Sequence, residues 1–214
     1  MRSNFDKQLV ILKNQLTEMA TLIENSIDCA ATALIIAGTE KAHKAIEYHS
    51  GIDEMEKSIE ALCLQILLQQ QPVAKDLRIV SAALKMITDM QRIGDQARDI
   101  SEILLDAPHP IRIDAAGGIS NMATATIKMV HDVVDAFVKN DMDIAKKVIT
   151  YDDIIDDMYI KTRAELIEVI RADQENVNMA VDLLSIAKYF EKIGDHAVNI
   201  AQWVIFSITG LHKI

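Results

Sequence analysis

The chain has 214 residues, of which 50% are hydrophobic, and it contains only seven glycines and three prolines. This composition is ample for a core and favours helices over a sheet protein, which needs more turns and more aromatic residues. A formal net charge of −10, with an excess of acid in both halves, argues against direct binding of nucleic acid or free phosphate as the main activity and favours metal cations or basic protein surfaces as partners.

Apolar residues spaced by threes and fours predict three long helices in the first half of the chain. They are expected from Phe5 to about Ala37, from about Lys41 to Gln69, and from about Lys75 to about Leu105. Gly38 is expected to stop the first helix, and Pro72 follows the end of the second.

The same plan restarts after a segment rich in helix-breaking residues. Residues 106–118 hold two of the three prolines and a Gly–Gly pair, so this segment is the best boundary between two units. Three further helices are expected over about 119–138, 142–170 and 177–207. The predicted fold class is therefore all-α, with two tandem three-helix bundles. The first repeat is residues 1–107, the linker 108–118 and the second repeat 119–214.

The cysteines and the chain ends indicate the compartment. Cys29 and Cys63 are isolated and form no CxxC pattern, as expected in a reducing environment. The first residues lack the apolar segment of a signal peptide. The longest uncharged stretch near the end, residues 197–211, is too short to span a bilayer. We therefore expect a cytoplasmic protein that reaches a membrane only through partners.

One motif occurs twice, one hundred residues apart. The segment Arg92-Ile93-Gly94-Asp95-Gln96-Ala97-Arg98-Asp99-Ile100 matches Lys192-Ile193-Gly194-Asp195-His196-Ala197-Val198-Asn199-Ile200. Self-similarity at a long fixed offset indicates a repeated structural unit. Each copy places a glycine inside a strong helical pattern, where glycine is roughly 1 kcal/mol less favourable than alanine. The repeated penalty predicts a shared requirement, either for close helix packing or for a binding site.

Four acids of the second repeat are expected at one level of two neighbouring helices. Asp152 and Asp156 are four residues apart, so both lie on one face of their helix. Glu191 and Asp195 have the same spacing on the next helix, and the two pairs are equally far from the intervening turn. Four carboxylates so placed repel one another unless cations neutralise them. Oxygen-preferring metal ions, namely Fe, Zn, Mn, Mg or Ca, are the expected cofactors.

The corresponding residues of the first repeat include only two acids. His49 and Asp53 are four residues apart on one helix, and Gln91 and Asp95 are four apart on the next. Asp53 lies 16 residues before Gln69 and Gln91 lies 16 after Lys75, so these pairs also share a level. An imidazole ligates metals and an amide oxygen does so weakly, while Asp99 is a candidate substitute one turn beyond Asp95. We therefore expect weaker or different metal binding here.

Other interpretations remain open. Paired acids on helices are usually solvated faces, and Asp153 and Asp157 are expected to face solvent. A role of Gly94 and Gly194 in close helix packing is about as well supported as a role in a binding site. Glu40-Lys41-Ala42-His43 is an isolated ExxH, and His131 has no partner at ligand spacing, so both are weak candidates. His196 adjoins Asp195 but points about 100° away around the helix, so a packing or surface role is expected. Arg92 and Lys192 either screen the acids or lie at the ordinary surface, and surface placement is the expectation. No catalytic residue is expected, because no nucleophile or phosphate-cradling motif is present.

The doubled (E/Q)-(R/K)-Ile-Gly-Asp-x-Ala motif resembles the phosphate-uptake regulator family PhoU, as does Gln71-Pro72-Val73-Ala74-Lys75-Asp76-Leu77-Arg78. The similarity covers residues 5–207. The resemblance implies two three-helix bundles related by a pseudo-twofold axis, with metal clusters held by pairs of E(D)xxxD motifs. These motifs fall on Asp152, Asp156, Glu191 and Asp195, and on Asp53 and Asp95. The departures at His49 and Gln91 put a full first cluster in doubt.

The resemblance also implies a non-enzymatic function. PhoU-like proteins are negative regulators that couple the ATPase subunit of the phosphate ABC transporter to a membrane sensor histidine kinase. A homodimer is expected, and nucleic acid is not expected as a partner. Two alternatives remain: a ferritin-like metal-dependent enzyme, which needs paired ExxH ligands, and a helical interaction module whose acids never bind metal.

Overall fold

The computed structural model describes residues 2–70, 72, 74–107 and 117–211. Within these ranges the chain forms six long α-helices and one 3-10 helix, and no strand. The elements in chain order are α1 (Arg2–Ile36), α2 (Thr39–Gln70), α3 (Lys75–Asp106), α4 (Gly117–Lys139), α5 (Met142–Ala172), η2 (Gln174–Asn176) and α6 (Val177–Thr209). The predicted all-α class is confirmed.

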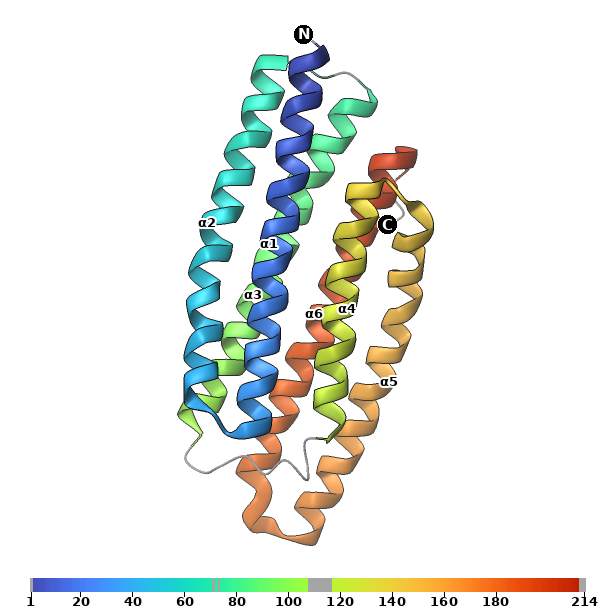
Figure 1. The fold of residues 1–214 in the computed structure, drawn as a ribbon. Helices are drawn as coiled ribbons and strands as arrows, with labels where there is room; N and C mark the ends of the chain where they lie inside the picture. Colours follow the sequence, from blue (N-terminus) through green and yellow to red (C-terminus); the bar gives the residue numbers. More distant parts are fainter. Residues whose placement is uncertain (1, 71, 73, 108–116, 212–214) are drawn as a thin grey trace.

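The helices form two three-helix repeats that run in opposite directions (Figure 1). Helices α1, α2 and α3 contact one another, and so do α4, α5 and α6. The α2–α3 hairpin turns at one end of the molecule and the α5–α6 hairpin at the other (Figure 1). The predicted pair of tandem three-helix bundles is confirmed.

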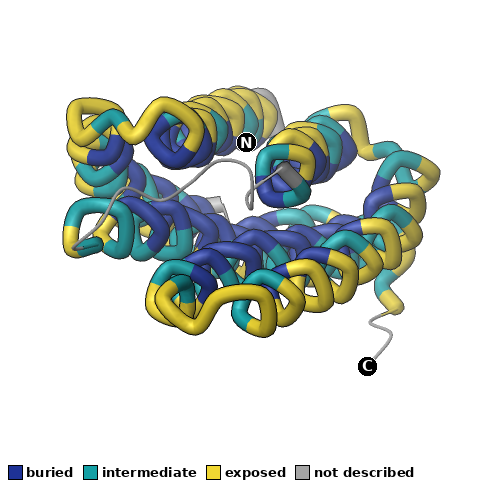
Figure 2. Tube along the Cα trace, turned by 90° about the horizontal axis from the view of Figure 1, so that it is seen from below, coloured by how far each residue is buried: buried dark blue, intermediate teal, exposed yellow. Residues whose placement is uncertain are grey.

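The two repeats share one hydrophobic core. Helices α3 and α6 contact each other as extensively as helices within a repeat, and α1 also contacts α4. Buried apolar side chains from all six helices join in a single cluster. Seen end-on, the buried residues face the interior and the exposed residues form the outer faces (Figure 2). Separating the repeats would therefore expose core surface to water.

Helix boundaries agree with the expected ones to within a few residues, with two informative differences. Helix α1 ends at Ile36, and Ala37, not Gly38, adopts the left-handed conformation with φ 50°. Gly117 and Gly118, which were assigned to the linker, form the start of α4. Residues 108–116 of the predicted linker lie outside the described part of the chain.

Among the described residues, one helix is long and apolar enough to cross a membrane, namely α1 over Asn4–Ile36. More than half of its apolar window is buried inside the protein. Leu12, Leu16 and Ile23 are fully buried in the core. Packing inside the bundle therefore accounts for the apolar character of α1.

Candidate metal centre

Helices α5 and α6 present the four predicted acids as an inner and an outer pair. Buried Ile155 and Ile193 fix the faces that the two helices turn toward the core. The inner pair is Asp152, which is half-buried, and Glu191, whose side chain is 12% exposed. The outer pair is Asp156, which is exposed, and Asp195, whose side chain is 40% exposed. Their exposed neighbours Asp153 and Asp157 face solvent, as predicted.

The acids are close enough to repel one another. Burial, followed by the charges of Asp156, Asp195 and Glu191, raises the pKa of Asp152 to about 6. Burial and the charges of Glu191 and Asp195 likewise raise the pKa of Asp156. Like charges raise a carboxyl pKa only at short range. The four acids therefore lie within electrostatic range of one another across the α5–α6 hairpin.

Two oxygens of the inner pair lack a hydrogen-bond partner. Asp152 Oδ1 and Glu191 Oε2 are both buried and make no hydrogen bond. Buried polar atoms in folded proteins almost always have a partner. A cation between α5 and α6 satisfies both oxygens and removes the repulsion, so these four residues fit a bound metal ion.

Gly194 makes room for this arrangement, whereas Gly94 serves packing. A Cβ atom added at Gly194 would lie 2.7 Å from Asp152 Oδ1. A Cβ atom added at Gly94 would lie 2.9 Å from Cδ1 of buried Ile52. The glycine of the first repeat is therefore explained by close helix packing, and the glycine of the second repeat by the space that the Asp152 carboxylate occupies.

Two lysines engage the acids of the second repeat. Lys188 Nζ lies 2.7 Å from Glu191 Oε1, and Lys192 contacts Asp195 and lies 3.4 Å from Glu191 Oε2. Both lysine side chains are more than 40% exposed, so they can swing into water. Within the described residues no three Asp, Glu, His or Cys side chains converge as a ready metal-binding group. Metal binding here would therefore require the acidic side chains to converge and to exchange their lysine contacts for the ion. Of the two placements considered for Lys192, the structure shows the one in which it screens the acids.

The four first-repeat residues also meet, but they bond to one another. His49 Nε2 lies 2.7 Å from Asp95 Oδ1, and His49 Nδ1 lies 3.6 Å from Asp53 Oδ2. Gln91 Nε2 donates to Asp53 Oδ1 at 3.3 Å. The predicted common level of these pairs is thus confirmed, while a ligand role for each remains a prediction.

Arg98 is the residue of this region that the sequence did not single out. Its guanidinium lies 3.3 Å from Asp95 Oδ1 and also binds Asp99. Asp99 faces an acidic groove between α3 and α6, which also includes Glu102 and Asp182, and it joins the His49 group only through Arg98. The available signal was the spacing of three residues between Asp95 and Arg98, which predicts an ion pair on one helix face.

Two further histidines, His196 and His131, contact acidic side chains of the other repeat. His196 Nδ1 lies 2.9 Å from Asp89 Oδ1 on α3, and the His196 side chain is 13% exposed. His131 lies 3.3 Å from Glu24 on α1. Both contacts join the two repeats, which confirms a packing or surface role. Glu40 and His43 of the isolated ExxH are exposed.

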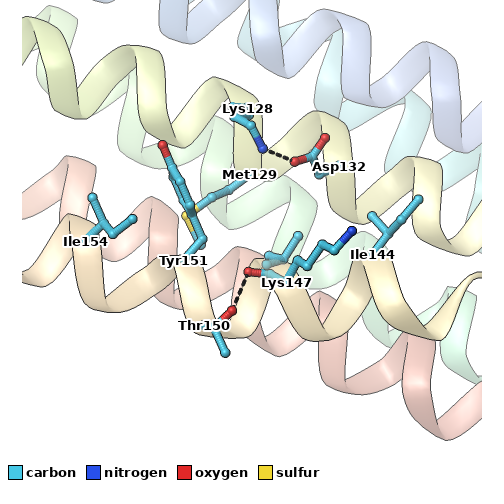
Figure 3. Close-up of a pocket in the computed structure, with 9 residues that line it drawn as sticks. Lys128, Met129, Asp132, Ile144, Lys147, Thr150, Tyr151 and Ile154 are labelled. Atoms are coloured by element: carbon cyan, nitrogen blue, oxygen red, sulfur yellow. Dashed lines mark hydrogen bonds and ion pairs between the residues drawn. The ribbon is translucent and has the colours of Figure 1, made fainter.

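A groove between α4 and α5 is lined by none of the four acids (Figure 3). Its volume is about 510 Å³, and Met129 and Val148 contribute apolar lining. Lys128 Nζ lies 5.1 Å from the centroid of the Tyr151 ring and also binds Asp132 (Figure 3). Asp132 is the one acid of this lining, so the groove does not supply a second group of metal ligands.

The repeated architecture corresponds to a known family. The family model described as "PhoU domain" matches the chain twice, over residues 16–104 and 119–204. The chain belongs to the PhoU family. The two matched segments coincide with the two three-helix repeats, and each contains one copy of the doubled motif.

Several PhoU proteins resemble this chain over nearly its whole length. The "phosphate-specific transport system accessory protein PhoU homolog 1" of Thermotoga maritima is 33% identical over 208 residues, which is 97% of this chain and 90% of that protein. The crystal structure of PhoU from Pseudomonas aeruginosa has a TM-score of 0.88 at 30% identity and covers 97% of this chain and 100% of that one. The structure from Streptococcus pneumoniae, at 24% identity, shares the fold with a TM-score of 0.88 and covers 98% of this chain and 99% of that one.

The second PhoU-like segment of the sequence, residues 71–78, is only partly described, because Gln71 and Val73 lie outside the described residues. Arg78 lies on the first turns of α3 against the end of α6. A Cβ atom added at Gly210 would lie 3.0 Å from Arg78 Nη1. This segment therefore contributes to the contact between α3 and α6.

Proposed function

We propose that this chain is a metal-binding negative regulator of phosphate uptake and of phosphate-starvation signalling. Support comes from the accessory proteins of phosphate transport that match it over nearly its full length. The observation that carries the metal-binding part is the buried Asp152 Oδ1, which has no hydrogen-bond partner, together with Glu191 Oε2, which makes no hydrogen bond and lies 3.4 Å from the mobile ammonium of Lys192. We propose that the protein is not an enzyme and acts in the cytoplasm as a homodimer.

In this proposal Asp152 and Glu191 hold the metal from the inside and Asp156 and Asp195 close the site from the solvent side. The bound Fe, Zn, Mn, Mg or Ca ion supplies positive charge that offsets the repulsion among the acids. Neutralising these side chains fixes the spacing of α5 and α6 and with it the outer surface of the second repeat. That surface is offered to the ATPase subunit of the phosphate ABC transporter and to the sensor histidine kinase.

Metal analysis of the purified protein tests the site. The double substitution Glu191→Ala plus Asp195→Ala is expected to lose most of the bound metal. Asp153→Ala plus Asp157→Ala removes the same number of acids from solvent-facing positions of α5 and is expected to retain it. Equal metal content in both variants would remove these residues as ligands.

The regulatory part is tested with the partners. Co-expression with the ATPase subunit of a phosphate ABC transporter is expected to give a complex that co-elutes in size-exclusion chromatography. Separate elution at micromolar concentrations counts against this partner. Because the chain is acidic, titration of metal-free protein with inorganic phosphate is expected to release no heat. Clear heat of binding would show that phosphate is recognised directly by the chain.

A further inference from the structure

The two repeats place different charges at matching positions. The second repeat has four carboxylates at these positions. The first repeat has only two, Asp53 and Asp95, and carries His49 and Gln91 at the other two positions. Along α3 and α6 the motif then carries Arg98 in the first repeat and Val198 in the second. At these positions the first repeat has two fewer negative charges and one additional fixed positive charge, and the next position adds one negative charge because Asp99 corresponds to Asn199.

Arg98 lies where it neutralises the remaining acids. Its Nη1 atom lies 3.3 Å from Asp95 Oδ1 and 3.3 Å from His49 Nε2. Its Nη2 and Nε atoms donate to Asp99 Oδ1 at 2.9 and 3.2 Å, and Nε lies 3.6 Å from Glu102 Oε1. One guanidinium thus binds three carboxylates and contacts the imidazole that would otherwise be a ligand.

The four first-repeat side chains at the matching positions leave no buried atom without a hydrogen-bond partner. In the described part of the chain, the buried side-chain atoms without hydrogen-bond partners include Asp152 Oδ1 and Glu191 Oε2 but no atom of His49, Asp53, Gln91 or Asp95. Each of these four first-repeat side chains has a partner within the group. The desolvation penalty that a metal would relieve in the second repeat is already relieved in the first.

Arginine suits this role better than the lysines of the second repeat. A guanidinium is always charged and presents its donors in a fixed planar fork, whereas an ammonium group is a mobile point charge. The Arg98 side chain is 32% exposed, and those of Lys188 and Lys192 are 44% and 43% exposed. The bond to Asp99 and the charges of Asp99, Asp95 and Glu102 raise the pKa of Arg98.

We infer that Arg98 is the resident cation of the first repeat, where it takes the place of a metal ion and confines metal binding to the second repeat. The confinement rests on the function proposed above, whereas the role of Arg98 as a structural cation does not.

Metal content of two paired variants tests the confinement. Asp152→Asn plus Glu191→Gln is expected to lower the bound metal at least about tenfold, since it removes two ligands. His49→Ala plus Asp95→Asn is expected to leave the metal content of the wild-type protein unchanged. Metal that survives the first pair and is lost in the second would overturn the inference. A wild-type chain without metal defeats the proposed function, and the stability measurement below then decides the role of Arg98.

Thermal unfolding of Arg98→Met tests whether Arg98 acts as a structural cation, and this test does not depend on whether the wild-type protein binds metal. Removing the guanidinium leaves Asp95, Asp99 and Glu102 without their shared counter-charge, so Tm is expected to fall by about 3–6 °C. Arg92→Met is the matched control, because it removes the same charge from an exposed position of α3 and is expected to leave Tm unchanged. Equal Tm values in the two variants would overturn the inference.

A gain-of-binding variant completes the test. His49→Asp, Gln91→Glu and Arg98→Val together give the first repeat the side chains of the second at three positions. Titration with Mn²⁺ or Zn²⁺ is expected to show roughly twice as many ions bound as in the wild type, with a rise in Tm. The same two acids introduced with Arg98 retained are expected to bind no extra metal; equal gain with and without Arg98 contradicts its role.

Discussion

Asp152 is the residue whose ionisation most affects the metal-free protein. Its pKa is raised to about 6, chiefly by burial, from 3.8. A carboxyl whose pKa is higher in the folded state destabilises the fold when ionised, so the free energy of unfolding should rise as the pH falls through about 6 toward 4. Asp152→Asn is expected to stabilise the metal-free protein at pH 7.5 by about 2–3 kcal/mol. Urea denaturation at pH 7.5 and 4.5 measures this, with Asp153→Asn as the exposed control; a gain that is equal at both pH values contradicts the assignment.

The two motif glycines should respond differently to the same substitution. Gly194→Ala displaces the flexible carboxylate of Asp152, so we expect weaker metal retention and a free energy of unfolding within about 1 kcal/mol of wild type, because alanine also favours the helix. Gly94→Ala meets Ile52, which is fully buried, so overpacking should lower the free energy of unfolding by about 1–2 kcal/mol without loss of metal. Urea denaturation and metal analysis of both variants test this. The reverse pattern would place the site requirement in the first repeat.

At the scale of the helix, the end of α1 is not optimal. Ala37 adopts a φ of 50°, a conformation in which residues with a Cβ atom are disfavoured and glycine is preferred. Ala37→Gly is expected to raise the free energy of unfolding by about 0.5–1 kcal/mol. Ala61→Gly, at an exposed interior position of α2, is expected to lower it by about 1 kcal/mol. If urea denaturation shows that both Ala37→Gly and Ala61→Gly lower the free energy of unfolding, the left-handed conformation of Ala37 carries no strain.

At the scale of the whole molecule, Asp89 links the repeats. It accepts from His196 at 2.9 Å and from Asn199 at 3.3 Å, both on α6. Asp89→Ala leaves the largely buried His196 and the exposed Asn199 without this partner and should lower the free energy of unfolding by about 1–3 kcal/mol, mainly through His196. Glu24→Ala breaks the exposed contact with His131 and should change it by less than about 0.5 kcal/mol. Because the core is continuous, urea should unfold both repeats in one transition; two separate transitions contradict a shared core.

The sequence by itself determined the helices, the repeat and the levels of the acids. Apolar periodicity depends only on residues close together in the sequence, so it predicts helices without knowledge of the fold. The start of α5 was also predictable, because the Asp141 side chain accepts hydrogen bonds from the amides of Asp143 and Ile144. The fixed rise per residue also sets which residues of a hairpin face each other. The pairing of His49 with Asp95 and of Asp53 with Gln91 therefore followed from counting.

Only the tertiary structure decided which side chains share which partners. The contact of His196 with Asp89 joins residues 107 apart, because α3 and α6 cross at the centre of the molecule, and no hairpin register predicts it. The direction of the Arg98 guanidinium and the engagement of Lys192 with Glu191 depend on side-chain rotamers in a crowded field of charge. The sequence therefore located the acids, whereas packing decided that Asp152 Oδ1 has no hydrogen-bond partner while the matching side chains of the first repeat bond to one another.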